Sequence, residues 1–78
     1  MTQRERVLNY IEDFGSITRM EAFFDLGIFE LPARICELEK EGYKFKKTQH
    51  TTKNRYGERI RFTRYRLLEE ENAGNSQN

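Results

Sequence analysis

Nine of the fourteen lysine and arginine residues of this chain lie within residues 44–66, a segment that holds one acidic residue. Nine positive charges against one negative charge give this segment a net charge of about +8, whereas the whole chain carries +1. Ammonium and guanidinium groups at this density pair readily with the phosphates of a nucleic acid. Aromatic residues alternate with the basic ones, which is typical of a β-hairpin. The segment therefore predicts a hairpin that binds a polyanion.

The basic residues of the hairpin divide into two groups by their position. Three flank the expected turn and are the best candidates for phosphate or minor-groove contacts: Lys53, Arg55 and Arg59. Others lie on the strands and either contact phosphates or pair with acidic residues of the helices: Lys44, Lys46, Arg64 and Arg66. Arg61 is a further candidate for a DNA contact. Tyr56 is a candidate for stacking or hydrogen bonding in a groove, or is a plain turn residue. The alternative for the whole segment is a solvated hairpin whose charges prevent edge-to-edge aggregation.

Amphipathic helices are expected to precede and position this hairpin. Capping-box spacing at Thr2 with Glu5, and again at Thr18 with Glu21, marks two helix starts. Apolar periodicity and the glycines that follow it predict helices over residues 3–14, 19–26 and 31–41, with a possible short strand at 16–18. Strands are expected over 43–48 and 58–68, joined by a polar loop over 49–57.

The core is expected to form from the apolar stripes of these helices. Helical spacing places the following residues in it: Val7, Ile11, Phe14, Phe23, Phe24, Leu31, Ile35 and Leu38. Ile17, in the extended link between the first two helices, is also expected to fill the core. In the second strand, Ile60 and Phe62 alternate out of phase with Tyr65 and Leu67. Either a bulge near Thr63 brings all four onto one face, or Ile60 and Phe62 lie on the solvent side.

The third helix carries the candidates for reading base edges. Arg34 and Ala33 lie in its first half, and Glu37 can accept a hydrogen bond from cytosine. The helix is nevertheless acidic, and the alternative for Arg34 is an i,i+3 pair with Glu37. Arg19, at the start of the second helix, is a further candidate for a phosphate contact.

Helix, link, helix, turn, helix and hairpin is the element order of a winged helix-turn-helix, an α+β fold. The motifs Gly15-Ser16-Ile17-Thr18, Leu26-Gly27-Ile28, Ala33-Arg34-Ile35 and Tyr65-Arg66-Leu67 also resemble a family of small helix-turn-helix domains common in bacteriophage and prophage genomes. The resemblance covers about residues 2–67. It implies a winged helix fold and DNA binding. In the winged helix-turn-helix architecture itself, the third helix is expected in the major groove and the hairpin on the adjacent backbone or minor groove.

Together these observations predict one winged helix domain over residues 1–68, followed by a disordered acidic and polar tail over 69–78. The expected partner is double-stranded DNA, bound without catalysis, cofactor or metal in the cytoplasm of a bacterial host. Regulation of phage genes, or an excisionase-like accessory role in recombination, is the expected setting. The alternatives are a module that binds a phage or host protein, and RNA binding through the same hairpin.

Overall fold

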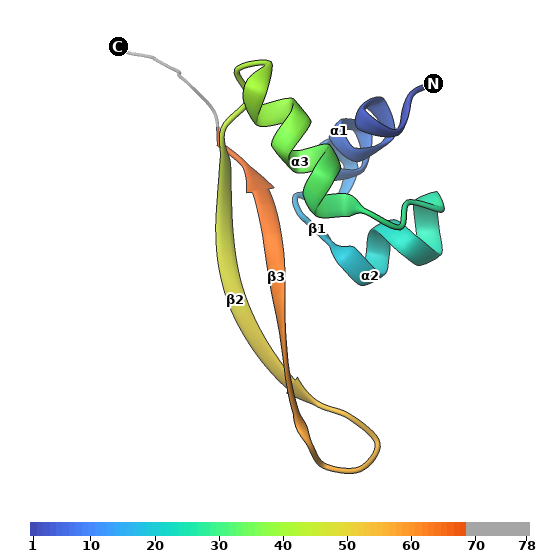
Figure 1. Ribbon diagram of the computed structural model, residues 1–78, viewed down its shortest axis with the longest axis vertical. Helices are drawn as coiled ribbons and strands as arrows, with labels where there is room; N and C mark the ends of the chain where they lie inside the picture. Colours follow the sequence, from blue (N-terminus) through green and yellow to red (C-terminus); the bar gives the residue numbers. More distant parts are fainter. Residues whose placement is uncertain (69–78) are drawn as a thin grey trace.

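The computed structural model describes residues 1–68, in which helical segments precede one antiparallel hairpin (Figure 1). In chain order the elements are α1 (Gln3–Phe14), β1 (Ile17–Thr18), α2 (Arg19–Glu21), η1 (Ala22–Leu26), α3 (Leu31–Lys40), β2 (Phe45–Lys53) and β3 (Arg59–Leu67). This order confirms the expected α+β architecture. The predicted tail at 69–78 lies outside the described residues. Among those described, every helix falls short of the length and hydrophobicity that crossing a membrane requires.

Both predicted capping boxes are present and fix where α1 and α2 begin. The Thr2 hydroxyl accepts from the Glu5 backbone N–H at 3.1 Å, and the Glu5 carboxylate accepts from the Thr2 N–H at 2.8 Å. Thr18 and Glu21 make the same reciprocal pair at 3.2 and 2.9 Å. Each pair satisfies two backbone donors that a helix start otherwise leaves exposed. Gly15 ends α1 at φ 88°, in the left-handed region that favours glycine.

The core lies between the helices and the root of the sheet. Its fully buried side chains come from α1, β1, the turn before α3, and α3: Val7, Ile17, Ile28, Leu31, Ile35 and Leu38. Three strands form the sheet in the order β1-β3-β2, and β1 pairs with β3 through Ile17 opposite Tyr65. The predicted short strand and the core role of Ile17 are therefore confirmed. Ile28, in the turn before α3, is a further core residue that lies outside the predicted helical stripes.

The prediction that Phe23 and Phe24 are buried is wrong, because the segment η1 is π-helical. The second helical segment begins at residue 19 and ends at residue 26 as expected, but it is α-helical only in α2, and residues 22–26 form the π-helical turn η1. A π-helical turn holds more residues than an α-helical one, so it changes the direction in which later side chains point. Phe24 is consequently 72% exposed and Phe23 is also exposed, while Ala22 and Ile28 occupy the core.

The expectation that Phe14 packs in the core is also wrong. Phe14 is the last residue of α1, and its side chain is 70% exposed. Ser16 and Ile17 are buried directly after it, so the chain turns into the core only beyond Gly15. The Phe14 ring lies instead against Tyr10 on the surface, with ring centroids 4.6 Å apart.

The hairpin of β2 and β3, called here the wing, is longer and more regular than expected. Residues 49–53, predicted to be loop, continue β2 and pair without interruption from Phe45 opposite Leu67 to Lys53 opposite Arg59. The predicted bulge near Thr63 is absent, because Gln49 pairs with Thr63 in the same register. Ile60 and Phe62 therefore lie on the face opposite Tyr65, as the second alternative required. Figure 1 shows the outer part of the wing projecting beyond the helices.

Candidate nucleic-acid interface

The wing tip is a compact turn organised by one asparagine. The Asn54 side-chain oxygen accepts from the backbone N–H groups of Tyr56 at 2.9 Å and Glu58 at 3.0 Å. Its amide nitrogen donates to the Glu58 carboxylate at 2.9 Å. Gly57 adopts φ 79°, which closes the turn. This network holds the side chains of Arg55 and Tyr56 outward, and Tyr56 is 81% exposed.

Most basic side chains of residues 44–66 have no acidic partner within the described part of the chain. Two of the nine do: Lys47 pairs with Glu39 of α3 at 3.2 Å, and Arg64 with Glu21 of α2 at 3.5 Å. For the other seven, no carboxylate of residues 1–68 lies within ion-pair distance, and all seven are exposed: Lys44, Lys46, Lys53, Arg55, Arg59, Arg61 and Arg66. Within residues 1–68, the charge of these seven side chains is therefore not neutralised by an ion pair.

The strand register also places like charges directly opposite one another. Lys53 faces Arg59 next to the tip, and Lys46 faces Arg66 near the root. Like charges at directly opposite positions destabilise a sheet. The two like-charge pairs, one at each end of the wing, are therefore unfavourable for the isolated hairpin and favourable for binding a polyanion.

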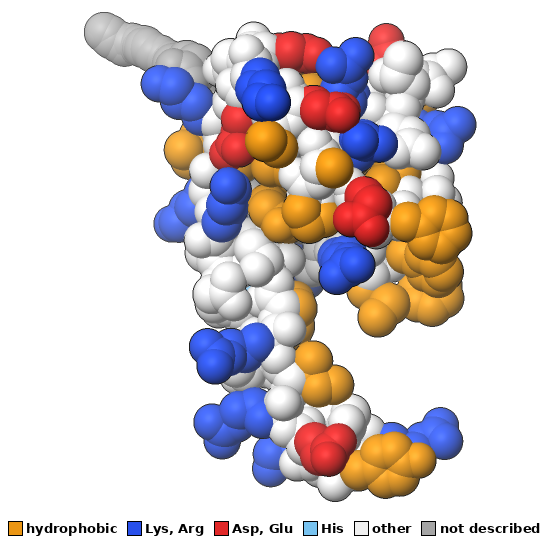
Figure 2. All heavy atoms as spheres, viewed as in Figure 1, with side chains coloured by type: hydrophobic (Ala, Val, Ile, Leu, Met, Phe, Trp, Pro, Cys, Tyr) orange, Lys and Arg blue, Asp and Glu red, His pale blue; other side chains and the backbone are white. Residues whose placement is uncertain are grey.

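Figure 2 shows how these charges are distributed over the wing. Lysine and arginine side chains gather along its outer side, whereas hydrophobic side chains face the hollow between wing and helices. The outer side therefore presents a strip of positive potential, which suits a phosphate backbone.

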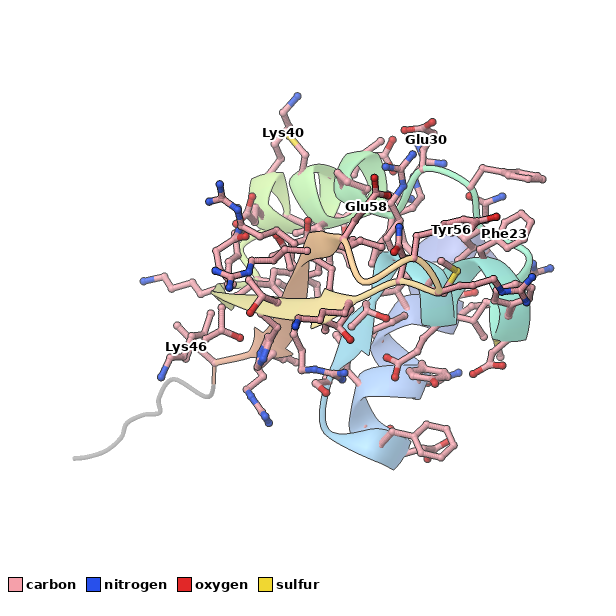
Figure 3. All side chains as sticks on the ribbon, turned by 90° about the horizontal axis from the view of Figure 1, so that it is seen from below. Phe23, Glu30, Lys40, Lys46, Tyr56 and Glu58 are labelled. Atoms are coloured by element: carbon pink, nitrogen blue, oxygen red, sulfur yellow. The ribbon has the colours of Figure 1, made fainter. Side chains whose placement is uncertain are left out.

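The outward face of α3 is nearly neutral in comparison. Pro32, Cys36, Glu39 and Lys40 are exposed along it, and Glu39 is already bound by Lys47. Figure 3 shows Lys40, and Glu30 just before α3, pointing away from the helical body on one side. Lys46 points to the opposite side of the wing in this view. The structure thus places Lys46 away from the outward face of α3.

The candidate base reader Arg34 lies on the shoulder of α3 that contacts α1. Its guanidinium donates to the Gln3 side chain at 2.9 Å and to Glu37 at 3.0 Å. The Nε atom is buried and has no hydrogen-bond partner within the described residues. The i,i+3 pair with Glu37 is therefore present. Ala33 is half-buried beside it.

Comparison with known proteins decides the family. A family model described as a winged helix-turn-helix domain matches residues 2–70, which is nearly the whole chain. The chain belongs to the winged helix-turn-helix family. Searches of curated proteins and of solved structures found no match. Membership supports DNA binding as the general activity of this winged helix-turn-helix protein.

The two remaining candidates of this winged helix-turn-helix protein lie where α2 meets the wing. Arg19 is exposed at the start of α2, but the capping box already occupies the backbone N–H groups of Thr18 and Glu21. Arg64 is half-buried and donates to the Ser16 hydroxyl at 2.8 Å as well as pairing with Glu21. Arg64 therefore anchors the root of the wing to the body.

The ion pair that holds the wing of this winged helix-turn-helix protein to α3 was not among the predictions from the sequence. The Lys47–Glu39 pair links the third residue of β2, near the root of the wing, to the last turn of α3. The two residues are eight positions apart in different elements, so no helical or strand periodicity connects them. The sequence does place the acidic end of α3 shortly before a basic strand. This proximity indicates ion pairs between the two elements, but it does not specify which residues pair.

Proposed function

We propose that this protein binds double-stranded DNA with the wing as its main contact to the phosphate backbone or minor groove. The observation that carries the proposal is the set of seven exposed cations of residues 44–66, six of them in the wing, that have no carboxylate of residues 1–68 within ion-pair distance. Positive charge held on a projecting element is accessible to phosphates, and releasing counterions from the duplex favours association. Tyr56, next to Arg55 at the tip, adds an aromatic group at the same end.

In this proposal α3 lies in the major groove and contributes specificity rather than affinity. Phosphate contacts position a protein on DNA, whereas contacts to base edges select the sequence. Arg34 is the proposed base reader, with Ala33 and Glu37 beside it. Arg34 has to exchange its bonds to Gln3 and Glu37 for a base edge, which costs part of the energy gained. Most of the binding energy is therefore assigned to the wing.

The proposed biological setting is regulation of phage genes, or an excisionase-like accessory role in recombination, in the cytoplasm of a bacterial host. The resemblance to small phage domains supports this setting. Either of these roles needs a protein that binds DNA, and neither role needs a cofactor or a catalytic centre.

Binding to random duplex DNA over a range of salt concentrations tests the proposal. The triple variant Lys53→Gln, Arg55→Gln, Arg59→Gln should weaken binding to every sequence and reduce the slope of log K against log salt by roughly 2–3 units. The single variant Lys47→Gln is the matched control, because this cation is already paired with Glu39. An unchanged slope in the triple variant would remove the wing from the interface.

A second candidate function is binding to a phage or host protein, with the winged fold as scaffold. The segment 30–41, which is α3 with one flanking glutamate at each end, carries a net charge of −2 from two basic and four acidic residues and favours this alternative. The absence of any gel shift at low salt and micromolar protein would support it over DNA binding. Competition between duplex DNA and RNA distinguishes the proposed partner from RNA.

A further inference from the structure

An apolar groove lies between the wing and the segment that contains α2 and η1. It encloses about 790 Å³. Its apolar lining comes from Met20, Phe23 and Phe29 on the helical side and from Ile60 and Phe62 on the wing. Figure 2 shows the same region as a hollow with hydrophobic side chains on both of its sides. In Figure 3, Phe23 and Tyr56 lie on the same side of the molecule.

The groove is not filled by residues 1–68. Met20 is 63% exposed and Phe29 is 68% exposed, although each has apolar neighbours close by. Phe23 and Phe29 lie with ring centroids 5.1 Å apart, so the aromatic surface is continuous. A contiguous apolar surface of this kind marks an interaction site more often than isolated exposed hydrophobic residues do.

The rim of the groove is positively charged, which limits what can occupy it. Arg19, Arg61 and Arg64 line it together with one acidic residue, Glu21. The Glu21 carboxylate is already occupied by Arg64 and by the Thr18 backbone. A complementary occupant therefore has an apolar or aromatic side chain flanked by carboxylates. Duplex DNA does not have this chemistry, because phosphate oxygens placed against Ile60 and Phe62 would lose their hydration.

The end of α1 in the same chain has this complementary chemistry. Phe14 projects from the surface directly after the exposed residues Glu12 and Asp13. These three residues are called here the knob. Asp25 lies beside them, where its carboxylate accepts a 2.8 Å hydrogen bond from the Tyr10 hydroxyl. Phe14 thus shares its surface with Asp13 and Asp25, and Arg6 is the one cation that lines the same surface within the described residues.

We propose that the knob of one copy of this protein docks in the groove of a second copy. Phe14 would pack among the apolar side chains of the groove, while Glu12 and Asp13 would pair with the arginines of its rim. The knob shares no residue with the groove lining, so the contact is heterologous. A heterologous contact continues from copy to copy, either into a ring or into an open chain. The proposal does not rest on DNA binding, although Arg19 and Arg61 belong both to the groove rim and to the candidate DNA contacts.

Sedimentation of the full chain in the absence of nucleic acid tests this association. The average mass of the wild type should rise with concentration beyond that of a dimer. Phe14→Ser removes the ring of the knob, and Ile60→Asp places a charge in the groove. Each variant should raise the dissociation constant of self-association at least about tenfold. Tyr56→Ser, an exposed aromatic residue on the wing outside the groove lining, is the matched control and should behave as the wild type.

Mixing the two defective variants provides the decisive measurement. Ile60→Asp retains its knob and Phe14→Ser retains its groove, so the mixture should form a complex that stops at one copy of each. With ¹⁵N-labelled Ile60→Asp, adding unlabelled Phe14→Ser should shift the amide signals of residues 12–15, and circular dichroism would establish that both variants are folded. A wild type that stays monomeric, a Phe14→Ser variant that associates as the wild type does, or a mixture that forms no complex would each overturn the proposal.

Discussion

Lys53 and Arg59 lie directly opposite each other on β2 and β3, next to the tip of the wing. Neither has a carboxylate partner within residues 1–68. Two positive charges in this arrangement repel each other, so the folded wing is less stable than its hydrogen bonding alone would make it. A bound phosphate would relieve this repulsion.

Reversing one of these charges should therefore separate stability from binding. Lys53→Glu should stabilise the protein by about 0.2–1 kcal/mol, because it creates an opposite-charge pair across the strands. The same change should weaken binding to all DNA sequences. Urea unfolding and fluorescence anisotropy measure the two effects. Lys53→Gln is the control, since it removes the repulsion without adding an attraction. A Lys53→Glu protein that binds DNA as tightly as the wild type would exclude this position from the interface.

Arg34→Ala should affect both folding and specificity. Loss of the bonds to Gln3 and Glu37 should lower the free energy of unfolding by about 1 kcal/mol. As the proposed base reader, the variant should also lose discrimination at one or two base pairs, at roughly 1–3 kcal/mol. Gln3→Ala is the control, because it removes the contact with α1 but retains the guanidinium. Equal weakening on all sequences would instead identify Arg34 as a phosphate contact.

Two arginines of β3 should differ sharply in their effect on stability. Arg64→Gln loses the bonds to Ser16 and Glu21 that hold the wing to the body, so we expect a destabilisation of about 1–2 kcal/mol. Arg61→Gln, three residues away on the same strand, loses no ion pair within residues 1–68 and should unfold as the wild type does. Thermal unfolding at low salt compares them. Equal melting temperatures would contradict the anchoring role of Arg64.

Tyr10 should make stability sensitive to alkaline pH. Its hydrogen bond to Asp25 raises the pKa of the Tyr10 hydroxyl from 10.0 to about 12. A group whose pKa is higher in the folded state stabilises the fold fully below the unfolded pKa, and loses this effect as pH rises through the folded pKa. The difference in stability between the wild type and Tyr10→Phe should therefore be constant below pH 10 and shrink between pH 10 and about 12.

Urea unfolding at several pH values measures this difference. Tyr56→Phe is the matched control, because Tyr56 is exposed at the wing tip and its hydroxyl makes no hydrogen bond within residues 1–68. A Tyr10→Phe difference that stays constant through pH 12 would show that the hydrogen bond to Asp25 does not contribute to folding.

The element order followed from the sequence because its signals are local. A capping residue, a glycine after a helix, and a stripe such as Leu31, Ile35 and Leu38 act within a few positions. The same logic failed at Phe23 and Phe24, because one π-helical turn changes which side of a helix faces the core. No residue pattern in this segment distinguishes that turn from an α-helical one.

The candidate site was predictable in its charge and less so in its geometry. Counting residues identified the basic segment, but pairing depends on distant partners such as Glu39 for Lys47 and Glu21 for Arg64. Residues 49–53, the first part of the loop expected over 49–57, are polar and lack the apolar alternation of a half-buried strand. They form a strand because β3 supplies a partner for every residue, including Thr51 opposite Arg61 and Thr52 opposite Ile60.

The reach of the wing has a mechanical consequence. The molecule measures 48 Å along its longest axis and 28 Å along the next, and the wing accounts for this elongation. The wing is attached to the helices at one end, where Arg64 and Lys47 form ion pairs with Glu21 and Glu39. A small tilt at that attachment moves the far end through a much larger arc, so a slight change at the root adjusts the tip to duplexes whose helical pitch or curvature differs.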